Sequence, residues 1–125
     1  MNLITNLAKK INSLPHKQMT LLVAIDGRGG SGKSILAKQL KQKLEEVTIV
    51  QLDDFAYPET DRERLLTQVI HPLKATEIAN YQRFDWGKKQ LAEWHKILPL
   101  GIVIIEGVST LHDKLNDYYD FRICF

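Results

Sequence analysis

The hydrophobic residues of this chain follow two patterns that alternate along the sequence. Four short apolar runs are rich in β-branched residues or alternate in polarity and predict strands: Thr20–Asp26 (TLLVAID), Val47–Leu52 (VTIVQL), Gly101–Gly107 (GIVIIEG) and Tyr118–Phe125 (YYDFRICF). The first run is nearly continuous, as expected of a strand covered on both faces. Strands that alternate with helices indicate an α/β fold, with three layers and a mostly parallel sheet.

Apolar residues at helical spacing predict helices between and before these strands. An amphipathic helix before Pro15 is marked by Leu3, Ile4, Leu7, Ile11 and Leu14, and a helix after a glycine-rich loop by Ile35, Leu36, Leu40 and Leu44. A helix that ends near Pro72 is marked by Leu65, Leu66, Val69 and Ile70, and a helix before Pro99 by Trp86, Leu91, Trp94 and Leu98. On the last of these helices, the two tryptophans share one face and are interpreted as core. A short helix is predicted to begin at Ser109 or Thr110, where Thr110 and Asp113 have capping-box spacing.

Composition narrows the class of protein. The 125 residues are expected to form one domain, residues 1–125. A net charge of +2, with basic residues scattered among acids, argues against nucleic-acid binding, and no apolar run is long enough to span a membrane. The single cysteine, Cys124, favours a reducing cytoplasm and is interpreted as a small core residue. The expected partners are therefore small molecules, and the expected location is the cytoplasm.

The pattern G-x-x-x-x-G-K-S occupies residues 27–34, between a predicted strand and a predicted helix. Glycines let the backbone curl round a phosphate, with N–H groups pointing inward at the positive end of the helix. In this pattern Lys33 reaches the terminal phosphates and the Ser34 hydroxyl ligates Mg²⁺. The strand–loop–helix context disfavours a simple turn with a solvated lysine. The sequence therefore predicts a polyphosphate site formed by Gly27, Arg28, Gly29, Gly30, Ser31, Gly32, Lys33, Ser34 and Ile35.

Acidic residues follow two of the predicted strands. Asp53 and Asp54 come directly after the second strand, and Glu106 closes the third. Ligands of open parallel sheets bind outside the carboxyl ends of the strands. Transfer of a phosphoryl group to an alcohol needs one carboxylate that accepts the hydroxyl proton and one that holds Mg²⁺. Any one of these acids alone is better explained as a loop or capping residue, but three on the rim of the glycine loop favour a site.

Five segments in order resemble the uridine kinase family: VAIDGRGGSGKS, LDDFAYP, YQRFDW, GIVIIEGVSTL and YYDFRICF. More broadly they resemble the superfamily of P-loop small-molecule kinases that includes phosphoribulokinase and bacterial pantothenate kinase. The likeness runs from about Thr20 to Phe125. It implies a P-loop fold, ATP and Mg²⁺ as cofactors, and phosphoryl transfer to a hydroxyl of a small molecule, with a nucleoside such as uridine or cytidine favoured and GTP left open as donor.

The resemblance also implies roles for single residues. Asp53 is the expected base, with Asp54 not excluded, and Glu106 is expected to assist Mg²⁺ or the acceptor. The segment Tyr81–Trp86 matches the region that contacts the acceptor, so Tyr81, Arg83 and Asp85 are candidate substrate contacts together with Asp54. Asp85 has a second interpretation as the cap of a following helix.

Other classes fit less well. The Asp-x-x-Gly of a GTPase is replaced by Glu106–Gly107, and no LSGGQ-like segment of a transporter ATPase is present. The histidines lack metal-ligand spacing and are interpreted as surface or structural residues: His16, His71, His95 and His112. The alternative of a different class is a nucleotide-binding module without efficient turnover.

The uridine kinase pattern continues beyond the position of Phe125, with an arginine-bearing lid, a fifth strand and a loop that contacts adenine. Without lid arginines, Lys33, the loop amides and Mg²⁺ would stabilise the transferred phosphoryl group, with Arg28 or Arg83 as additional candidates. The implied strand order, 2-3-1-4-5, would leave the fourth strand as an open edge. Such an edge invites pairing with another chain, so a homo-oligomer is expected.

Overall fold

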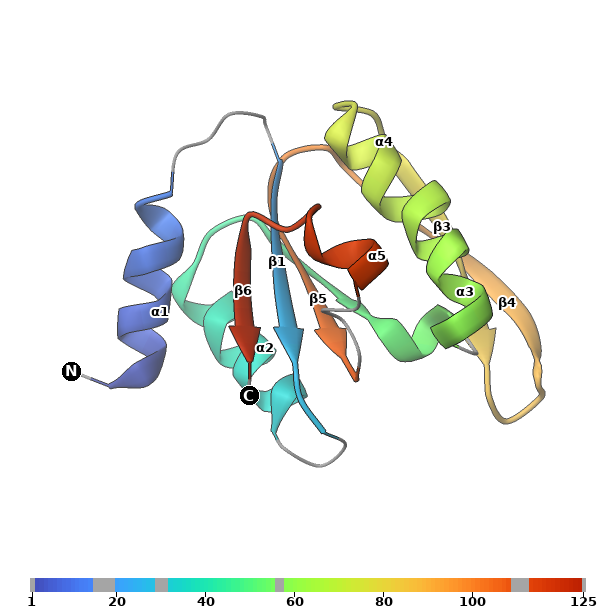
Figure 1. The fold of residues 1–125 in the computed structure, drawn as a ribbon, viewed down its shortest axis with the longest axis horizontal. Helices are drawn as coiled ribbons and strands as arrows, with labels where there is room; N and C mark the ends of the chain where they lie inside the picture. Colours follow the sequence, from blue (N-terminus) through green and yellow to red (C-terminus); the bar gives the residue numbers. More distant parts are fainter. Residues whose placement is uncertain (1, 15–19, 29–31, 56–57, 109–112, 125) are drawn as a thin grey trace.

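A four-stranded sheet, in the order β2-β5-β1-β6, forms the centre of the fold (Figure 1). This computed structural model describes residues 2–14, 20–28, 32–55, 58–108 and 113–124. All three strand pairings are parallel, and the strands are β1 (Thr20–Asp26), β2 (Val47–Gln51), β5 (Gly101–Gly107) and β6 (Phe121–Cys124). The predicted strands and their order are confirmed, and the predicted bounds of β1 and β5 are those of the structure.

Alternation along the buried strands divides the core into two clusters, one on each face of the sheet. On one face, β1 and β5 contribute Leu21, Val23, Ile25, Ile102 and Ile104 to a cluster with helices α1 (Leu3–Asn12) and α2 (Lys33–Lys43). On the other face they contribute Leu22, Ala24, Val103 and Ile105. Both faces of the central strands are therefore covered, as their continuous apolar sequences require.

The helical layer on the second face is a run of consecutive elements. It comprises α3 (Pro58–Leu65), a π-helical segment (Leu66–Ile70) and α4 (His71–Lys74), with the short α5 (Asp113–Asn116) nearby. The helical run passes through Pro72 and ends at Lys74, two residues beyond the proline near which the stop was predicted. In the π segment the His71 N–H donates to the Leu66 carbonyl oxygen. This wider turn accommodates a proline ring that would otherwise meet the carbonyl of the preceding α-helical turn.

The prediction of a helix marked by Trp86, Leu91, Trp94 and Leu98 is wrong. Residues 79–97 form an antiparallel hairpin of β3 (Ala79–Asp85) and β4 (Gln90–Ile97). The two tryptophans are also not core: Trp86 and Trp94 are 48% and 58% exposed. Leu91 and Leu98 of the expected apolar stripe are also exposed, whereas Ala79, Tyr81 and Ile97 are buried against the α3–α4 run. Cross-strand pairing and the burial of these three residues favour the hairpin.

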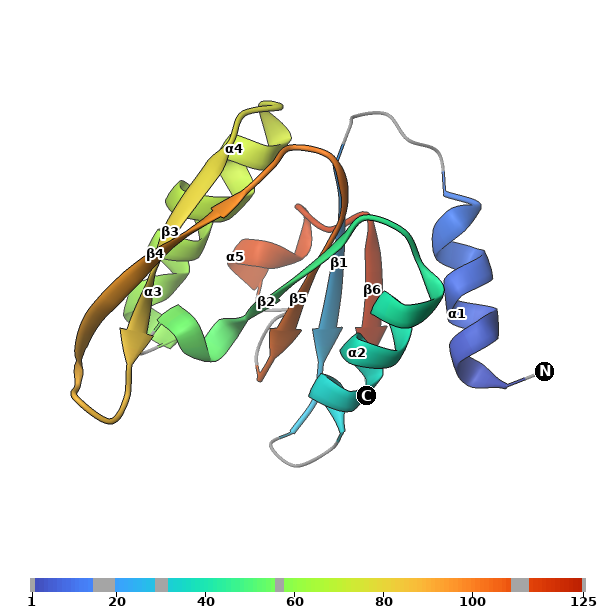
Figure 2. The same ribbon diagram turned by 180° about the vertical axis from the view of Figure 1, so that it is seen from behind.

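Figures 1 and 2 show α1 and the hairpin at opposite ends of the molecule, with the sheet between them. The amphipathic helix predicted at the N-terminus is confirmed as α1, and Asn2 caps it by accepting the Thr5 N–H at 2.8 Å. The predicted start of the short helix at Ser109 or Thr110 lies outside the described residues. Among the described residues, no helix has the length and apolarity needed to cross a bilayer.

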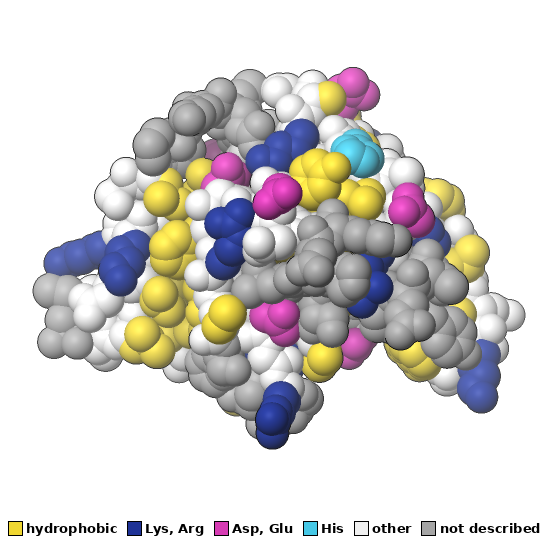
Figure 3. All heavy atoms as spheres, in the orientation of Figure 1, with side chains coloured by type: hydrophobic (Ala, Val, Ile, Leu, Met, Phe, Trp, Pro, Cys, Tyr) yellow, Lys and Arg dark blue, Asp and Glu magenta, His cyan; other side chains and the backbone are white. Residues whose placement is uncertain are grey.

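Strand β6 is at the edge of the described sheet. Figure 3 shows hydrophobic side chains gathered in a strip between α1 and β6 on this face. Ile123 is buried here, while Cys124 on the alternate face is exposed, so the prediction of a core cysteine is wrong. Pairing of this edge with a second chain stays a prediction.

We expect Ile104→Ala to lower the free energy of unfolding by about 2–5 kcal/mol, because the truncation leaves a cavity in the middle of the sheet. Ile104 is fully buried in β5. Urea denaturation measures the change. The matched control is Ile78→Ala, at a position 47% exposed, which should change stability by less than about 0.5 kcal/mol. Equal effects of the two substitutions would contradict the assigned core.

Candidate functional site

Three parallel strands bring the predicted functional residues to one edge of the sheet. Strand β1 runs into the glycine loop, β2 into a 3-10 turn (η1, Leu52–Phe55), and β5 ends at Glu106 and Gly107. In the register, Glu106 lies opposite Ile25 of β1 on one side and Gln51 of β2 on the other. The carboxylate of Glu106 therefore stands between the glycine loop and the turn that carries Asp53 and Asp54.

The start of α2 forms the wall of the candidate phosphate site. Gly32, Lys33, Ser34 and Ile35 line a cavity of about 270 Å³. Gly32 precedes the helix with φ = 96°, a left-handed conformation that favours glycine. The Lys33 ammonium donates to the Arg28 carbonyl oxygen at 2.8 Å, so the lysine folds back across the loop. Gly29, Gly30 and Ser31 lie outside the described residues.

Ser34 and Glu106 meet although they are far apart in the sequence. The Ser34 hydroxyl donates to the Glu106 carboxylate at 2.8 Å, and Glu106 is only 6% exposed. No lysine or arginine of the described residues forms an ion pair with this buried carboxylate. A buried carboxylate without a cationic side chain, next to a hydroxyl, is a donor set that suits Mg²⁺ bound also by phosphate oxygens and water. These two residues therefore fit the metal.

The neighbouring carboxylates Asp53 and Asp54 have different environments. Asp53 is exposed, and its backbone carbonyl accepts the Trp86 indole N–H at 2.8 Å. Asp54 is half-buried, and burial raises the pKa of its carboxyl, while the charges of His95 and Arg83 partly oppose that rise. The exposed Asp53 carboxylate thus stands on the same turn as Asp54, whose pKa is raised by burial.

An aromatic stack connects this turn to the hairpin. Phe55 stacks on Tyr81 at a ring-centroid distance of 5.3 Å, and Tyr81 stacks on His95 at 5.2 Å. Burial, and then the charge of Asp54, raise the pKa of Tyr81 to about 12, so its hydroxyl keeps its proton at neutral pH. The stack presents a hydroxyl and an imidazole near Asp54.

A charge network follows on the hairpin surface. The Arg83 guanidinium donates twice to Glu93, at 2.5 and 2.9 Å, and lies 3.8 Å from Asp85. His95 Nε2 lies 2.6 Å from the same Glu93 carboxylate. The hydrogen bonds from Arg83 and His95 lower the pKa of Glu93 to about 2. Asp85 accepts the Lys88 N–H at 3.1 Å, so it caps the hairpin turn and not a helix.

Sequence reasoning missed three residues that the structure brings to this area: Trp86 as the contact to Asp53, and Glu93 and His95 as partners of Arg83 and Tyr81. His95 was interpreted as a surface or structural residue; it is exposed, and its stacking on Tyr81 makes it part of the candidate site. Ala79 and Tyr81 alternate with polar residues, which is a strand signal, and the turn residues Gly87 and Lys88 follow. This pattern could have indicated a hairpin.

We expect Arg83→Gln to raise the pKa of Glu93 from about 2 toward its ordinary value of 4.5, since the arginine hydrogen bonds are its largest cause. Because the pKa is depressed in the folded state, the pair stabilises the protein above pH 4.5 and loses this effect as the pH falls toward 2. Carboxyl carbon NMR across a pH titration measures the shift. Lys96→Gln on the same strand is the charge-matched control, and an unmoved Glu93 titration in Arg83→Gln would refute the account.

Comparison with known proteins agrees with this geometry. Residues 1–98 match the KAP family P-loop domain. Curated relatives include the uridine kinase of Borrelia duttonii, which is 22% identical over 84% of this chain, and that of Clostridium botulinum strain Okra, which is 25% identical over 82%. In both cases the match spans 60% of the relative's length.

A solved structure shows the same fold over almost the whole chain. It is described as a possible uridine kinase from Bacillus stearothermophilus, with a TM-score of 0.82 and 25% identity, and covers 97% of this chain and 78% of its own. The relatives are P-loop kinases, and the likeness to uridine kinases inferred from the sequence motifs is confirmed. This chain belongs to the KAP family of P-loop domains and is similar to the uridine kinase-like P-loop kinases.

Proposed function

We propose that this protein catalyses ATP-dependent phosphoryl transfer to a hydroxyl group of a small molecule, with a nucleoside as the favoured acceptor. The observation that carries the proposal is the Ser34–Glu106 hydrogen bond, at the sheet edge where the glycine loop and Asp53 also lie. This pair of a hydroxyl and a buried carboxylate supports the proposal, because P-loop kinases hold a phosphate-bound Mg²⁺ with such groups.

The proposed chemistry divides among residues already described. The loop amides at Gly32 and Ser34 and the ammonium of Lys33 bind the phosphates of ATP. Asp53 accepts the proton of the acceptor hydroxyl, whose oxygen forms a bond to the γ-phosphorus, while the bond to the β–γ bridging oxygen breaks and ADP leaves. Mg²⁺, held through Ser34 and Glu106, supplies positive charge at the phosphate oxygens.

The hairpin supports a binding site for the acceptor. His95 and Arg83 offer an exposed ring and hydrogen-bonding groups within the electrostatic reach of Asp54, and the buried Tyr81 stacks behind His95. A nucleoside combines a flat heterocycle with sugar hydroxyls, which is the chemistry that such a wall would recognise. Asp54 and Asp85 are further proposed contacts of the acceptor.

The proposed location is the cytoplasm, which the single cysteine fits.

Lys33→Ala should raise the dissociation constant of Mg²⁺-ATP by ~10–100-fold, because it removes a charge-assisted contact to the phosphates. Isothermal titration calorimetry measures the affinity. Lys38→Ala is the control, since Lys38 is an exposed lysine on the same helix and lies outside the residues that line the phosphate cavity. Unchanged binding in Lys33→Ala would remove the glycine loop from the proposal.

Asp53→Asn should lower kcat for nucleoside phosphorylation by ~10²–10⁴-fold, as expected for loss of a general base, without weakening ATP binding. ADP release with uridine, cytidine and simpler alcohols as acceptors measures transfer. Asp54→Asn is the matched comparison, and we expect its main effect on KM. A larger loss of kcat in Asp54→Asn would reassign the base, and absence of transfer to every acceptor would leave a nucleotide-binding module.

A further inference from the structure

Arg62 is a cationic residue that neither the core nor the candidate site described above explains. It is half-buried in α3 (Pro58–Leu65), and its Nε atom is buried without a hydrogen-bond partner among the described residues. No carboxylate of the described residues forms an ion pair with its guanidinium. A buried N–H group of a guanidinium costs free energy when it has no acceptor. Arg62 therefore calls for an acceptor that the described residues do not supply.

The other arginines of α3 and the hairpin already have acceptors. The Arg83 guanidinium donates to the Glu93 carboxylate, and the Arg64 guanidinium donates to the Gln82 carbonyl oxygen. The sequence offered Arg83 as an additional cation for the transferred phosphoryl group. Its charge is neutralised by Glu93, whereas the charge of Arg62 is not.

Arg62 lies on the side of α3 that faces the sheet. It precedes Leu65 and Leu66 by three and four residues, and both leucines are buried in the core cluster, so the three side chains share one face of the helix. Side chains of an α-helix tilt toward its N-terminal end. Figures 1 and 2 show this end of α3 beside η1, at the same end of the molecule as the arrowheads of β1 and β5. The Arg62 side chain therefore leans toward the carboxyl edge of the sheet, where the candidate site lies.

Under the proposed function a phosphoryl group crosses this edge. It passes from ATP at the start of α2 to an acceptor beside Asp53, and its charge is spread over three oxygens during the transfer. The carboxylates of Asp53 and Glu106 repel these oxygens, so a cation besides Lys33 lowers the barrier. A guanidinium suits this task because its planar fork can donate to two phosphate oxygens at once.

We propose that Arg62 is a catalytic residue whose guanidinium donates to the oxygens of the phosphoryl group during its transfer. The inference rests on the proposed function, because it assumes that ATP binds at the glycine loop. It adds a cation from α3, which packs on the face of the sheet opposite to α2. Because Arg62 contacts the transferred group and not the rest of the nucleotide, it contributes to kcat and not to the binding of ADP.

The test compares Mg²⁺-ADP alone with Mg²⁺-ADP plus aluminium fluoride, an inorganic mimic of the phosphoryl group in transfer. Isothermal titration calorimetry measures both dissociation constants for the native protein, for Arg62→Met and for Arg62→Lys. Methionine keeps an apolar stem without the guanidinium, and lysine keeps the charge without the fork. The matched control is Arg122→Met, which removes the same charge from an arginine already bonded to Asn116. Circular dichroism checks folding, and Arg62→Lys decides by the same criterion if Arg62→Met does not fold.

In Arg62→Met we expect the dissociation constant of the aluminium fluoride complex to rise by ~10–100-fold, as for the loss of a hydrogen bond to a charged group. The dissociation constant of Mg²⁺-ADP should change by less than about twofold, as should both constants in Arg122→Met. Arg62→Lys should weaken the aluminium fluoride complex less than Arg62→Met does.

Three results would overturn the inference while the phosphate site stands. They are an unchanged aluminium fluoride complex in Arg62→Met, equal weakening of both ligands, and a native protein that binds Mg²⁺-ADP but gains no affinity from aluminium fluoride. A loss confined to the KM of acceptors that carry a phosphate or carboxylate would assign Arg62 to the acceptor and also overturn it. If the folded native protein binds neither ligand, the proposed function fails and the inference fails with it.

Discussion

The site depends on the register that places Glu106 in the middle of the parallel sheet. Glu106 pairs with Ile25 on one side and Gln51 on the other, so its carboxylate reaches Ser34 at the start of α2. A slip of one residue would turn this side chain to the opposite face of the sheet and exchange the residues that β5 contributes to the two core clusters. The same alternation that separates the two core clusters therefore also positions the carboxylate beside the glycine loop.

The hairpin is joined to this edge by a small number of specific contacts. The Trp86 indole donates to the backbone of Asp53, and Phe55 stacks on Tyr81. These contacts hold an aromatic and charged surface next to two carboxylates whose environments differ. Burial raises the pKa of Asp54, while Asp53 lies in solvent. The turn therefore gives different environments to two adjacent aspartates whose environments would be similar in the unfolded chain.

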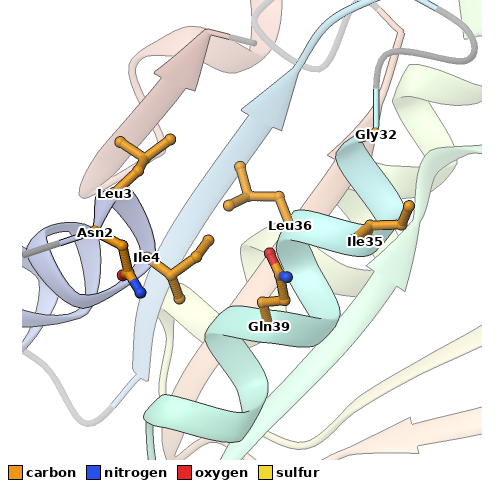
Figure 4. Close-up of a pocket in the computed structure, with 7 residues that line it drawn as sticks. All are labelled: Asn2, Leu3, Ile4, Gly32, Ile35, Leu36 and Gln39. Carbon is orange, nitrogen blue, oxygen red and sulfur yellow. The ribbon is translucent and has the colours of Figure 1, made fainter.

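Helices α1 and α2 border a groove at the start of α2 (Figure 4). Helix α2 also supplies the turn of the candidate phosphate site, and α1 supplies the other wall of the groove. Both helices pack on the same face of the sheet through one core cluster. Packing energy that stabilises the fold thus also fixes the distance across the groove.

The sequence by itself determined the sheet and the phosphate loop, because buried β-branched runs and glycine spacing are local signals. The strands from Thr20 and Gly101 have the predicted bounds. Tertiary structure alone decided the hairpin of residues 79–97, since Leu91 and Trp94 are exposed and the ladder depends on partners across the turn. It also decided that Ile4 of α1 and Leu36 of α2 line one groove, because only the packing of α1 on α2 brings those positions together.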